Sequence, residues 1–326
     1  MPIVFRPARA EELQSAEELV VRSINDLTVR HGFGPMATLR PPDFQLFSLE
    51  DDPDGLWVAD ADGEILGFAF SWVCGGLWFL AELFVAPGHQ GRGIGNELLA
   101  RTFAHAKKAG ATNKALITFN FNIVSQGLYI RHGLFPRLPI YFFNVARETL
   151  MSRLQIQKLR CTYTEVTASH LNSLAQIDAS ALSISRDRHQ RYLLNDSTMN
   201  GILLYEGDDR VGYAYVSASG HVGPLAVTRP DVMGDAFTIA LKLAAASGAP
   251  QVSAFLPGVS DTALRIAVEH GMRITFPMVT GIGARIRRLE PVPAAQSRLH
   301  VIGCVRRATV RLVPHCCAAF LFACDR

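Results

Sequence analysis

The feature that most restricts how this chain can fold is an internal repeat. Four short segments of the first half recur in the same order in the second half. The offset is 145 residues between Gly67 and Gly212, and it falls to 138 residues between His132 and His270. The matching segments begin at Trp57 and Leu203, Leu66 and Val211, Leu83 and Leu225, and Arg131 and Glu269. Ordered self-similarity indicates a duplicated structural unit, so we expect two copies of one α/β unit.

Length and composition fit two globular domains. The 326 residues are 49% hydrophobic and 19% charged, so each half can bury its own core. A net charge of +3 is too small for a nucleic-acid footprint, and we expect no nucleic-acid partner. No uninterrupted apolar run is long enough to span a membrane, and the N-terminus lacks a signal-peptide pattern. We therefore expect a soluble, cytoplasmic protein with no membrane partner.

The first half alternates between helix and strand patterns. Apolar residues recur every three or four positions over residues 8–28, which predicts an amphipathic helix. The turn sequence at residues 60–63 separates two apolar runs and predicts a β-hairpin. Further strands are predicted at residues 3–6, 78–85 and 114–119, with two closing strands within 134–145. Further helices are predicted at residues 94–109 and 123–132.

Residues 83–99 join a strand, a glycine-rich loop and a helix start. Glycines at 91, 93 and 95 let the backbone turn tightly and expose successive N–H groups beside the positive end of the helix. Arg92 adds a mobile positive charge. The loop lacks the Gly-Lys-Ser/Thr of a P-loop, and its alternate glycines differ from the dinucleotide fingerprint. It predicts a phosphate site, and a simple helix-capping loop is the alternative.

This loop resembles motif A of the GNAT acetyltransferases, whose Gln/Arg-x-x-Gly-x-Gly/Ala sequence holds the pyrophosphate of acetyl-CoA. Gln90, Gly93 and Gly95 match that pattern. Residues 122–134 resemble the family's Asn-x-x-Ala-x-x-Leu-Tyr-x-x-x-Gly-Phe, with Ser125 and Leu134 as the departures. The opening strand also looks like the family's first strand. The resemblance implies an α/β fold of two tandem GNAT-like domains, each a mixed, mostly antiparallel twisted sheet flanked by helices.

The resemblance also assigns catalytic roles. Tyr129 matches the family tyrosine that protonates the departing CoA thiolate, and packing on the sheet is its alternative role. Glu82 is a candidate base, placed by strand alternation on the face of Phe84, and a water relay is the alternative. No metal is expected as a cofactor. The implied acetyl-CoA-binding residues are Leu83, Phe84, Val85, Gln90, Gly91, Arg92, Gly93, Ile94, Gly95, Asn96, Asn122 and Ser125.

Two of these roles carry more detail. The main chain of residues 83–85 would hydrogen-bond pantetheine and the acetyl carbonyl, in a wedge where the fourth and fifth strands separate. Asn122 could bind the pantetheine arm or cap the helix that begins at Ile123. The aromatic residues Phe68, Phe70, Trp72 and Tyr141 could line the acceptor pocket or fill the core.

The second half departs from the motif at the loop. One glycine and two carboxylates, Asp231 and Asp235, follow the strand there, and Pro230 removes an amide donor. We interpret this half as a degenerate, structural copy. From Thr280 the sequence changes to eight arginines, no lysine and four cysteines, in place of closing strands. A metal site at His315, Cys316, Cys317 and Cys324 has weak spacing, and an irregular tail or an altered reading frame is the alternative.

The expected organisation is a GNAT domain over residues 1–150, a degenerate copy over 151–285 and an atypical tail over 286–326. The expected function is transfer of the acetyl group of acetyl-CoA to a primary amine, by direct attack in a ternary complex. A small-molecule amine is the expected partner. The alternatives are acetylation of a protein N-terminus or lysine, or a non-catalytic acyl-CoA sensor. The sequence does not indicate the oligomeric state.

Overall fold

The computed structural model describes residues 2–154 and 158–283, which form two compact units. Unit 1 extends to Pro136 and includes residues 281–283, and unit 2 extends over Arg137–Thr280. This division falls earlier than the expected boundary at residue 150. The expected tail over 286–326 lies outside the described residues.

The sheet of unit 1 has the strand order β1-β2-β3-β4-β5, beside the last residues of β12. All its strand pairs are antiparallel except the parallel pair β4 and β5. The strands are β1 (Val4–Pro7), β2 (Leu56–Ala61), β3 (Glu64–Cys74), β4 (Leu77–Val85) and β5 (Asn113–Phe119). Asp62 and Gly63 turn the β2–β3 hairpin with positive φ angles of 52° and 87°. The predicted hairpin is therefore confirmed, with turn residues that tolerate the left-handed region.

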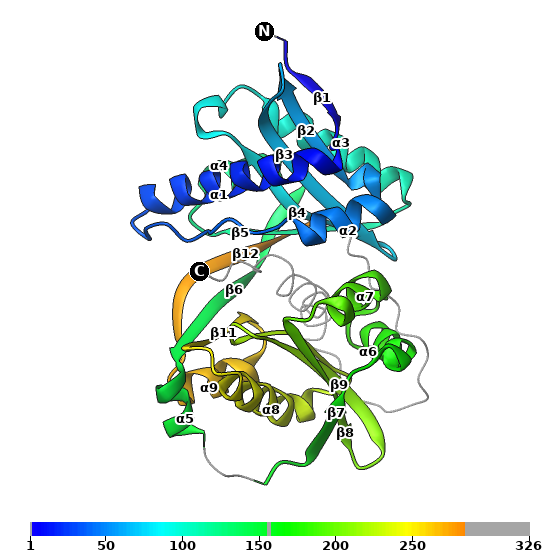
Figure 1. Cartoon of the computed structure of the whole chain (residues 1–326), viewed down its shortest axis with the longest axis vertical. Coiled ribbons are helices and arrows are strands. Elements are labelled where there is room, and N and C mark those ends of the chain that lie inside the picture. Colours follow the sequence, from blue (N-terminus) through cyan, green and yellow to red (C-terminus); the bar gives the residue numbers. More distant parts are fainter. Residues whose placement is uncertain (1, 155–157, 284–326) are drawn as a thin grey trace, which may run out of the picture. The chain divides into compact units, whose positions relative to one another are not determined.

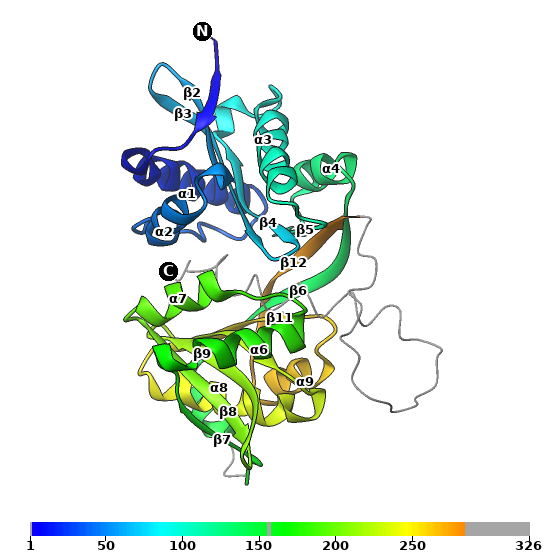
Figure 2. The same ribbon diagram turned by 90° about the vertical axis from the view of Figure 1, so that its right-hand side faces the viewer.

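Helices cover both faces of the sheet in unit 1. Figure 2 shows α1 and α2 on one side of the strands and α3 and α4 on the other. The helices are α1 (Leu13–Arg30), α2 (Asp43–Asp51), α3 (Ile94–Lys108) and α4 (Ile123–Arg131). Helix α1 buries its periodic apolar stripe, which includes Leu13, Ala16 and Leu19. The predicted helices are confirmed, whereas α2 was not predicted.

Unit 2 repeats this architecture, with helices α5–α9 and strands β7–β11 (Figure 1). Its strand order is β12-β6-β11-β10-β9-β8-β7, and the mixed, mostly antiparallel sheet expected for each unit is confirmed. The strands are β6 (Leu134–Ala146), β7 (Cys161–Glu165), β8 (Met199–Glu206), β9 (Asp209–Ser217), β10 (His221–Val227), β11 (Gln251–Pro257) and β12 (Arg273–Gly283). The helices are α5 (Arg147–Arg153), α6 (Leu171–Leu182), α7 (Asp187–Asn195), α8 (Met233–Ala246) and α9 (Asp261–Glu269).

Alternation along β9 gives unit 2 two core layers. Tyr213 and Tyr215 pack with residues of α6 and α7 such as Leu174 and Leu193. Their neighbour Ala214 joins the other layer, which contains Phe237 and further residues of α8. Helices therefore cover both faces of this sheet as well, as period-2 alternation requires.

Two details of the closing strands differ from expectation. Residues 134–145 form one long strand, β6, and not two, because the chain stays extended through Pro136 and Pro139 and then pairs with β11 in unit 2. The second half also keeps a closing strand, since β12 follows Gly271 and continues through Thr280. The prediction that atypical sequence from Thr280 replaces this strand was therefore wrong. The apolar residues Phe276, Met278 and Val279 bury themselves in the strand before the composition changes.

Candidate active site

The glycine loop of unit 1 connects β4 to α3 through a short 3-10 turn, Pro87–His89. Gly91 and Gly93 have φ angles of 78° and 84°, a region that costs other residues strain. A Cβ atom added at either position would meet nothing within 4 Å, so open space lies beside both. At Gly95 an added Cβ would make ordinary contacts of 3.6 Å and 3.7 Å with Val85 and Leu128. Backbone conformation therefore demands glycine at 91 and 93, whereas position 95 also admits alanine.

The N-terminus of α3 presents N–H groups to this open space. The N–H of Glu97 donates to the Gly93 carbonyl at 3.1 Å, which closes the first helical turn. The N–H groups of Ile94, Gly95 and Asn96 precede that bond and have no carbonyl one turn earlier in the helix. With the positive end of the helix dipole they form an arrangement that fits a phosphate.

Several side chains of the loop form hydrogen bonds within the chain. Gln90 Nε2 donates to the Val85 carbonyl at 3.1 Å and thereby ties the loop to the end of β4. The exposed Arg92 makes a 3.4 Å contact with the Gly88 carbonyl. Asn96 Oδ1 lies 2.8 Å from Nε2 of His132, which connects α3 to the end of α4. Of the predicted loop side chains, Arg92 is the one that projects a charge into solvent beside the glycines.

Strands β4 and β5 separate just before this loop. Their parallel register covers Leu77 to Leu80 against Asn113 to Leu116 and then ends. The break coincides with a β-bulge, because Phe70 pairs with Glu82 while Ser71 pairs with Leu80, which leaves Ala81 without an opposite residue. A bulge bends its strand, so the main chain of residues 83–85 keeps its pairs with β3 but has none with β5. The expected wedge is therefore present, and the bulge is its local cause.

Tyr129 lies in α4 on the α3 side of the sheet. Its side chain packs with Trp78, Leu80 and Leu116 and is 7% exposed. Burial raises the pKa of Tyr129 well above its usual range, and the side-chain hydrogen bond with Ser125 opposes this. The phenol therefore stays protonated at neutral pH, which is the state that a general acid needs.

Asn122 caps helix α4. Its side-chain oxygen accepts a hydrogen bond of 3.2 Å from the N–H of Ser125. This is the capping alternative for Asn122, since an N-cap oxygen takes one of the otherwise unpaired N–H groups of the first turn. Ser125 is thus attached to Asn122 through its main chain and to Tyr129 through its side chain.

Glu82 lies on the opposite side of the sheet from Tyr129. Gln45 Nε2 in α2 donates to Glu82 Oε1 at 3.0 Å and lies 3.3 Å from Glu17 Oε2 in α1. Burial raises the pKa of Glu82 to about 8, the carboxylate of Glu17 adds to the rise, and the bond from Gln45 opposes it. Neither Glu17 nor Gln45 was predicted from the sequence, and Gln45 belongs to the helix that the sequence did not reveal.

The aromatic residues proposed for an acceptor pocket belong to the core. Phe68, Phe70 and Trp72 are buried almost completely. Tyr141 lies in unit 2, where it packs against the main apolar cluster. This decides for the core alternative, because alternate residues of β3 face α1 and α2 rather than solvent.

In unit 2 the connection between β10 and α8, which corresponds to the glycine loop, is occupied by side chains of unit 2. Asp235 Oδ2 accepts hydrogen bonds from the N–H groups of Arg160 and Cys161, at 2.5 Å and 3.1 Å. Asp231 contacts Arg229 and Arg160 at 3.3 Å and 3.6 Å. Between β10 and β11 there remains a cavity of about 30 Å³, lined mainly by apolar residues such as Leu225. Carboxylates therefore stand where unit 1 exposes N–H groups.

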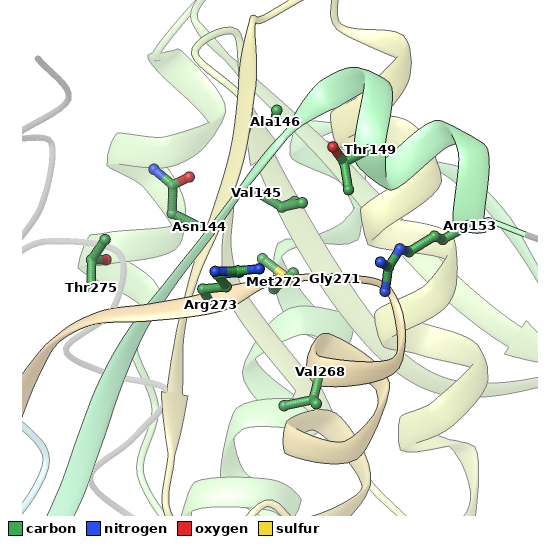
Figure 3. A pocket seen from close by; sticks show the side chains of 10 residues that line it. All are labelled: Asn144, Val145, Ala146, Thr149, Arg153, Val268, Gly271, Met272, Arg273 and Thr275. Carbon is green, nitrogen blue, oxygen red and sulfur yellow. The ribbon is translucent and has the colours of Figure 1, made fainter.

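A separate groove of about 540 Å³ lies in unit 2. Arg153 at the end of α5 and Arg273 at the start of β12 flank it from two sides (Figure 3). None of the predicted site residues lines it. The described residues contain no group of three histidine, cysteine or acidic side chains that could hold a metal ion. The weak metal pattern at His315 and its neighbouring cysteines lies outside them.

No helix within residues 2–154 and 158–283 combines the length and apolar character needed to cross a membrane.

Comparison with known proteins relates part of unit 1 to a family. Residues 22–134 match the model of the acetyltransferase (GNAT) family. A protein of Archaeoglobus fulgidus described as an uncharacterized N-acetyltransferase is 37% identical over 68 residues, which are 18% of this chain and 44% of that protein. The chain therefore aligns with less than half the length of this curated relative.

Solved structures share the fold over most of the chain. A putative acetyltransferase from Pyrococcus horikoshii has a TM-score of 0.66 at 18% identity, over 87% of this chain and 90% of that one. A tandem GNAT protein from the clavulanic acid biosynthesis pathway has a TM-score of 0.59 at 15% identity, over 86% and 98%. The family match lies in the unit with the glycine loop, and a tandem GNAT protein shares the fold of both units. Residues 22–134 therefore match the acetyltransferase (GNAT) family, and the fold of the two units is similar to that of a tandem GNAT protein.

Proposed function

We propose that unit 1 transfers the acetyl group of acetyl-CoA to the primary amine of a small molecule. The observation that carries this proposal is the wedge between β4 and β5, which ends at the glycine loop and lies between Tyr129 on one face of the sheet and Glu82 on the other. A phosphate site, an open strand edge, a neutral phenol and a carboxyl group are the parts that acyl transfer from a CoA thioester requires.

The loop is the proposed pyrophosphate site. Its N–H groups and the helix dipole attract an anion, and the space beside Gly91 and Gly93 leaves room for one. Glu97, in the first turn of α3, is paired with Arg101 at 2.8 Å, which reduces its repulsion of a phosphate. The main chain of residues 83–85, which pairs with β3 but not with β5, would hydrogen-bond the pantetheine arm and the acetyl carbonyl on its β5 side, as strand addition does for an extended ligand.

The chemistry needs one base and one acid. Glu82 accepts a proton from the ammonium of the acceptor, and the free amine then attacks the thioester carbonyl carbon. The carbon–nitrogen bond forms, the carbon–sulfur bond breaks, and Tyr129 donates its proton to the thiolate. The nitrogen loses its second proton as the amide forms, which restores the phenol. Because both partners are bound together, no acyl-enzyme is needed.

Purified chain should therefore release free CoA from acetyl-CoA only when an amine is supplied. The panel is ethylamine, putrescine, glucosamine, lysine and a peptide with a free N-terminus, and acetylated product is identified by mass spectrometry. A solved protein of this fold is described as part of clavulanic acid biosynthesis, a small-molecule pathway, so small amines are tested first. Preference for the peptide would favour a protein acetyltransferase. Acetyl-CoA binding without turnover of any amine would favour a sensor.

A further inference from the structure

Two carboxyl groups of unit 1 meet across one amide. Glu17 from α1 and Glu82 from β4 both lie within hydrogen-bond distance of Gln45 Nε2 from α2, at 3.3 Å and 3.0 Å. We call Glu17 and Glu82 the carboxyl pair. Glu17 is 8% exposed, and the second oxygen of Glu82, Oε2, is buried with no hydrogen-bond partner among the described residues. A buried, unpartnered carboxyl oxygen is costly unless it is protonated or meets a cation.

A positive charge acts on one member of the carboxyl pair, Glu17, and none acts on the other, Glu82. Arg40, from the segment before α2, is the positive group whose field acts on Glu17. Glu82 is acted on by burial, by Glu17 and by the amide of Gln45, and Phe70 lies opposite it on β3. Burial raises the pKa of both carboxyl groups. The pair therefore carries one shared proton near neutral pH, because two like charges this close cannot both ionise cheaply.

Unit 2 contains a related cluster that already includes its own cation. There Gln190 Nε2 of α7 donates to Asp178 Oδ2 of α6 at 3.0 Å. The corresponding contact in unit 1 is that between Gln45 of α2 and Glu17 of α1. The guanidinium of Arg186 bonds to Asp178 at 3.0 Å and 3.3 Å. Both side chains are at most 1% exposed. The hydroxyl of Tyr215, which matches Phe70 at the repeat offset of 145, donates to Gln190 Oε1 at 3.0 Å.

The comparison shows what unit 1 lacks. The duplicated cluster is complete in unit 2, where a carboxylate, a glutamine and a cation satisfy one another. In unit 1 a second carboxyl group, Glu82, stands where the repeat has Pro224, and no basic side chain among the described residues bonds to it. At the repeat offset of 145, Arg186 corresponds to residue 41, next to Arg40, whose charge acts on Glu17, whereas Glu82 has no basic partner of its own among the described residues.

We propose that Glu17 and Gln45 are positioning residues for Glu82: Gln45 holds its carboxyl group toward Glu17, and Glu17 shares the proton that Glu82 must lose before it can act as the base. This inference rests on the proposed acetyl transfer, in which the acceptor is a primary amine. When the ammonium enters, the shared proton leaves to solvent, and the cation takes its place beside the ionised pair. Glu82 then accepts one proton from the ammonium, and the reaction proceeds as described above.

Two substitutions should move the pH profile in opposite directions. Glu17→Gln removes the neighbouring charge, so the acid limb of kcat/KM should move to lower pH by roughly half to one pH unit. The same change should raise KM for the amine about tenfold, because half of the anionic pair is lost. Gln45→Met removes the bond that stabilises the ionised Glu82, so the acid limb should move to higher pH. The probe is the panel amine with the highest kcat/KM.

The controls separate this inference from the proposed function. Glu18→Gln changes an exposed carboxyl group on the same helix and should leave the profile and KM unchanged. The dissociation constant of acetyl-CoA should stay the same in all variants. Superimposable profiles for wild type, Glu17→Gln and Gln45→Met would overturn the inference while acetyl transfer stands. Shifts of both variants in the same direction would also overturn it, because a loss of packing, and not of charge, would then explain them.

The pH dependence of stability tests the carboxyl pair without any substrate, and so applies even if no amine of the panel reacts. The unfolding free energy of the wild type should decrease between about pH 5 and pH 8, because the folded pair holds a proton that the unfolded chain has released. Glu17→Gln should reduce this decrease, whereas Glu18→Gln should not. An unchanged slope in Glu17→Gln would overturn the shared proton, whatever the enzyme assay shows.

Discussion

At the residue scale, burial acts on both proposed proton-transfer groups in the same direction but with opposite consequences. It raises the pKa of Tyr129 and so keeps the phenol in the state that can donate a proton. It also raises the pKa of Glu82 to about 8, which keeps this carboxyl group protonated and unable to accept one. The proposed acid is therefore protonated at neutral pH, whereas the proposed base becomes ionised only at higher pH or beside a cation.

Replacement of Tyr129 by phenylalanine tests the acid. The ring and its packing against Trp78 and Leu116 remain, so the affinity for acetyl-CoA should stay nearly constant. Turnover should fall by about 10² to 10⁴, the usual loss for general-acid catalysis. Steady-state kinetics and calorimetry on the same preparation measure both. If turnover stays within about threefold and the variant is only less stable, Tyr129 is a packing residue.

Glu82→Gln should remove most of the pH dependence of stability between about pH 5 and pH 8. The folded-state pKa lies above the unfolded value, so the folded chain binds more protons in this window and its stability falls as pH rises. The slope contributed by one such group is at most about 1.4 kcal/mol per pH unit. Urea unfolding at several pH values measures it. An identical slope in Glu82→Gln would show that another group titrates.

At the element scale, the site depends on how β4 ends and α3 begins. The bulge at Ala81 separates β4 from β5, and two left-handed glycines reverse the chain into the helix. The equivalent connection in unit 2 runs through Pro230–Val232 and places Asp235 at the start of α8. The same strand–loop–helix order thus leaves the helix N-terminus beside open glycines in one copy, and in the other it places a carboxylate there that binds the N–H groups of Arg160 and Cys161.

Gly93→Asp should therefore weaken CoA binding at least tenfold. An aspartate adds a negative charge where the pyrophosphate is expected, as well as strain at a φ of 84°. Gly110→Asp is the matched control, because Gly110 at the other end of α3 also has a positive φ, 70°, and open space. Both variants should lose about 1 kcal/mol of stability, but only Gly93→Asp should lose affinity. Equal affinities would place the pyrophosphate elsewhere.

The attachment of α6 and α7 to β9 depends on the buried pair of Asp178 and Arg186. Asp178→Asn leaves the guanidinium buried without its counter-charge, which should cost about 3–5 kcal/mol. Glu269→Gln breaks a surface pair with Arg265, at 3.7 Å, and should cost less than about 0.5 kcal/mol. Denaturant unfolding compares the two variants. Similar small costs would mean that water reaches the Asp178 cluster.

At the scale of the whole molecule, duplication has produced two units with the same architecture and different polar clusters. Unit 1 has the glycine loop and a pair of carboxyl groups without a bonded cation. In unit 2 a carboxylate, Asp235, stands at the corresponding loop, and Arg186 pairs with the buried carboxylate of Asp178. We expect one CoA per chain for this reason. Titration calorimetry of wild type should give a stoichiometry near one, and Gly93→Asp should weaken binding at that single site. Two sites per chain would show that the carboxylates at α8 do not exclude the pyrophosphate.

The sequence by itself determined the local structure, including the backbone conformation of the glycine loop. The helices, the hairpin at Gly63 and the turns at Gly91 and Gly93 each depend on a few neighbouring residues, and the repeat copies such local patterns. Backbone conformation at such positions depends mainly on the residues themselves, which explains why these predictions agree with the structure.

Only the tertiary structure decided the rest. The bulge at Ala81, the short helix α2 and the single long strand β6 depend on what each segment packs against. The contacts of Gln45 reach across 28 residues to Glu17 and across 37 residues to Glu82, distances over which no local pattern acts. The raised pKa of Glu82 follows from that packing, because desolvation and a neighbouring charge exist only once the helices cover the sheet.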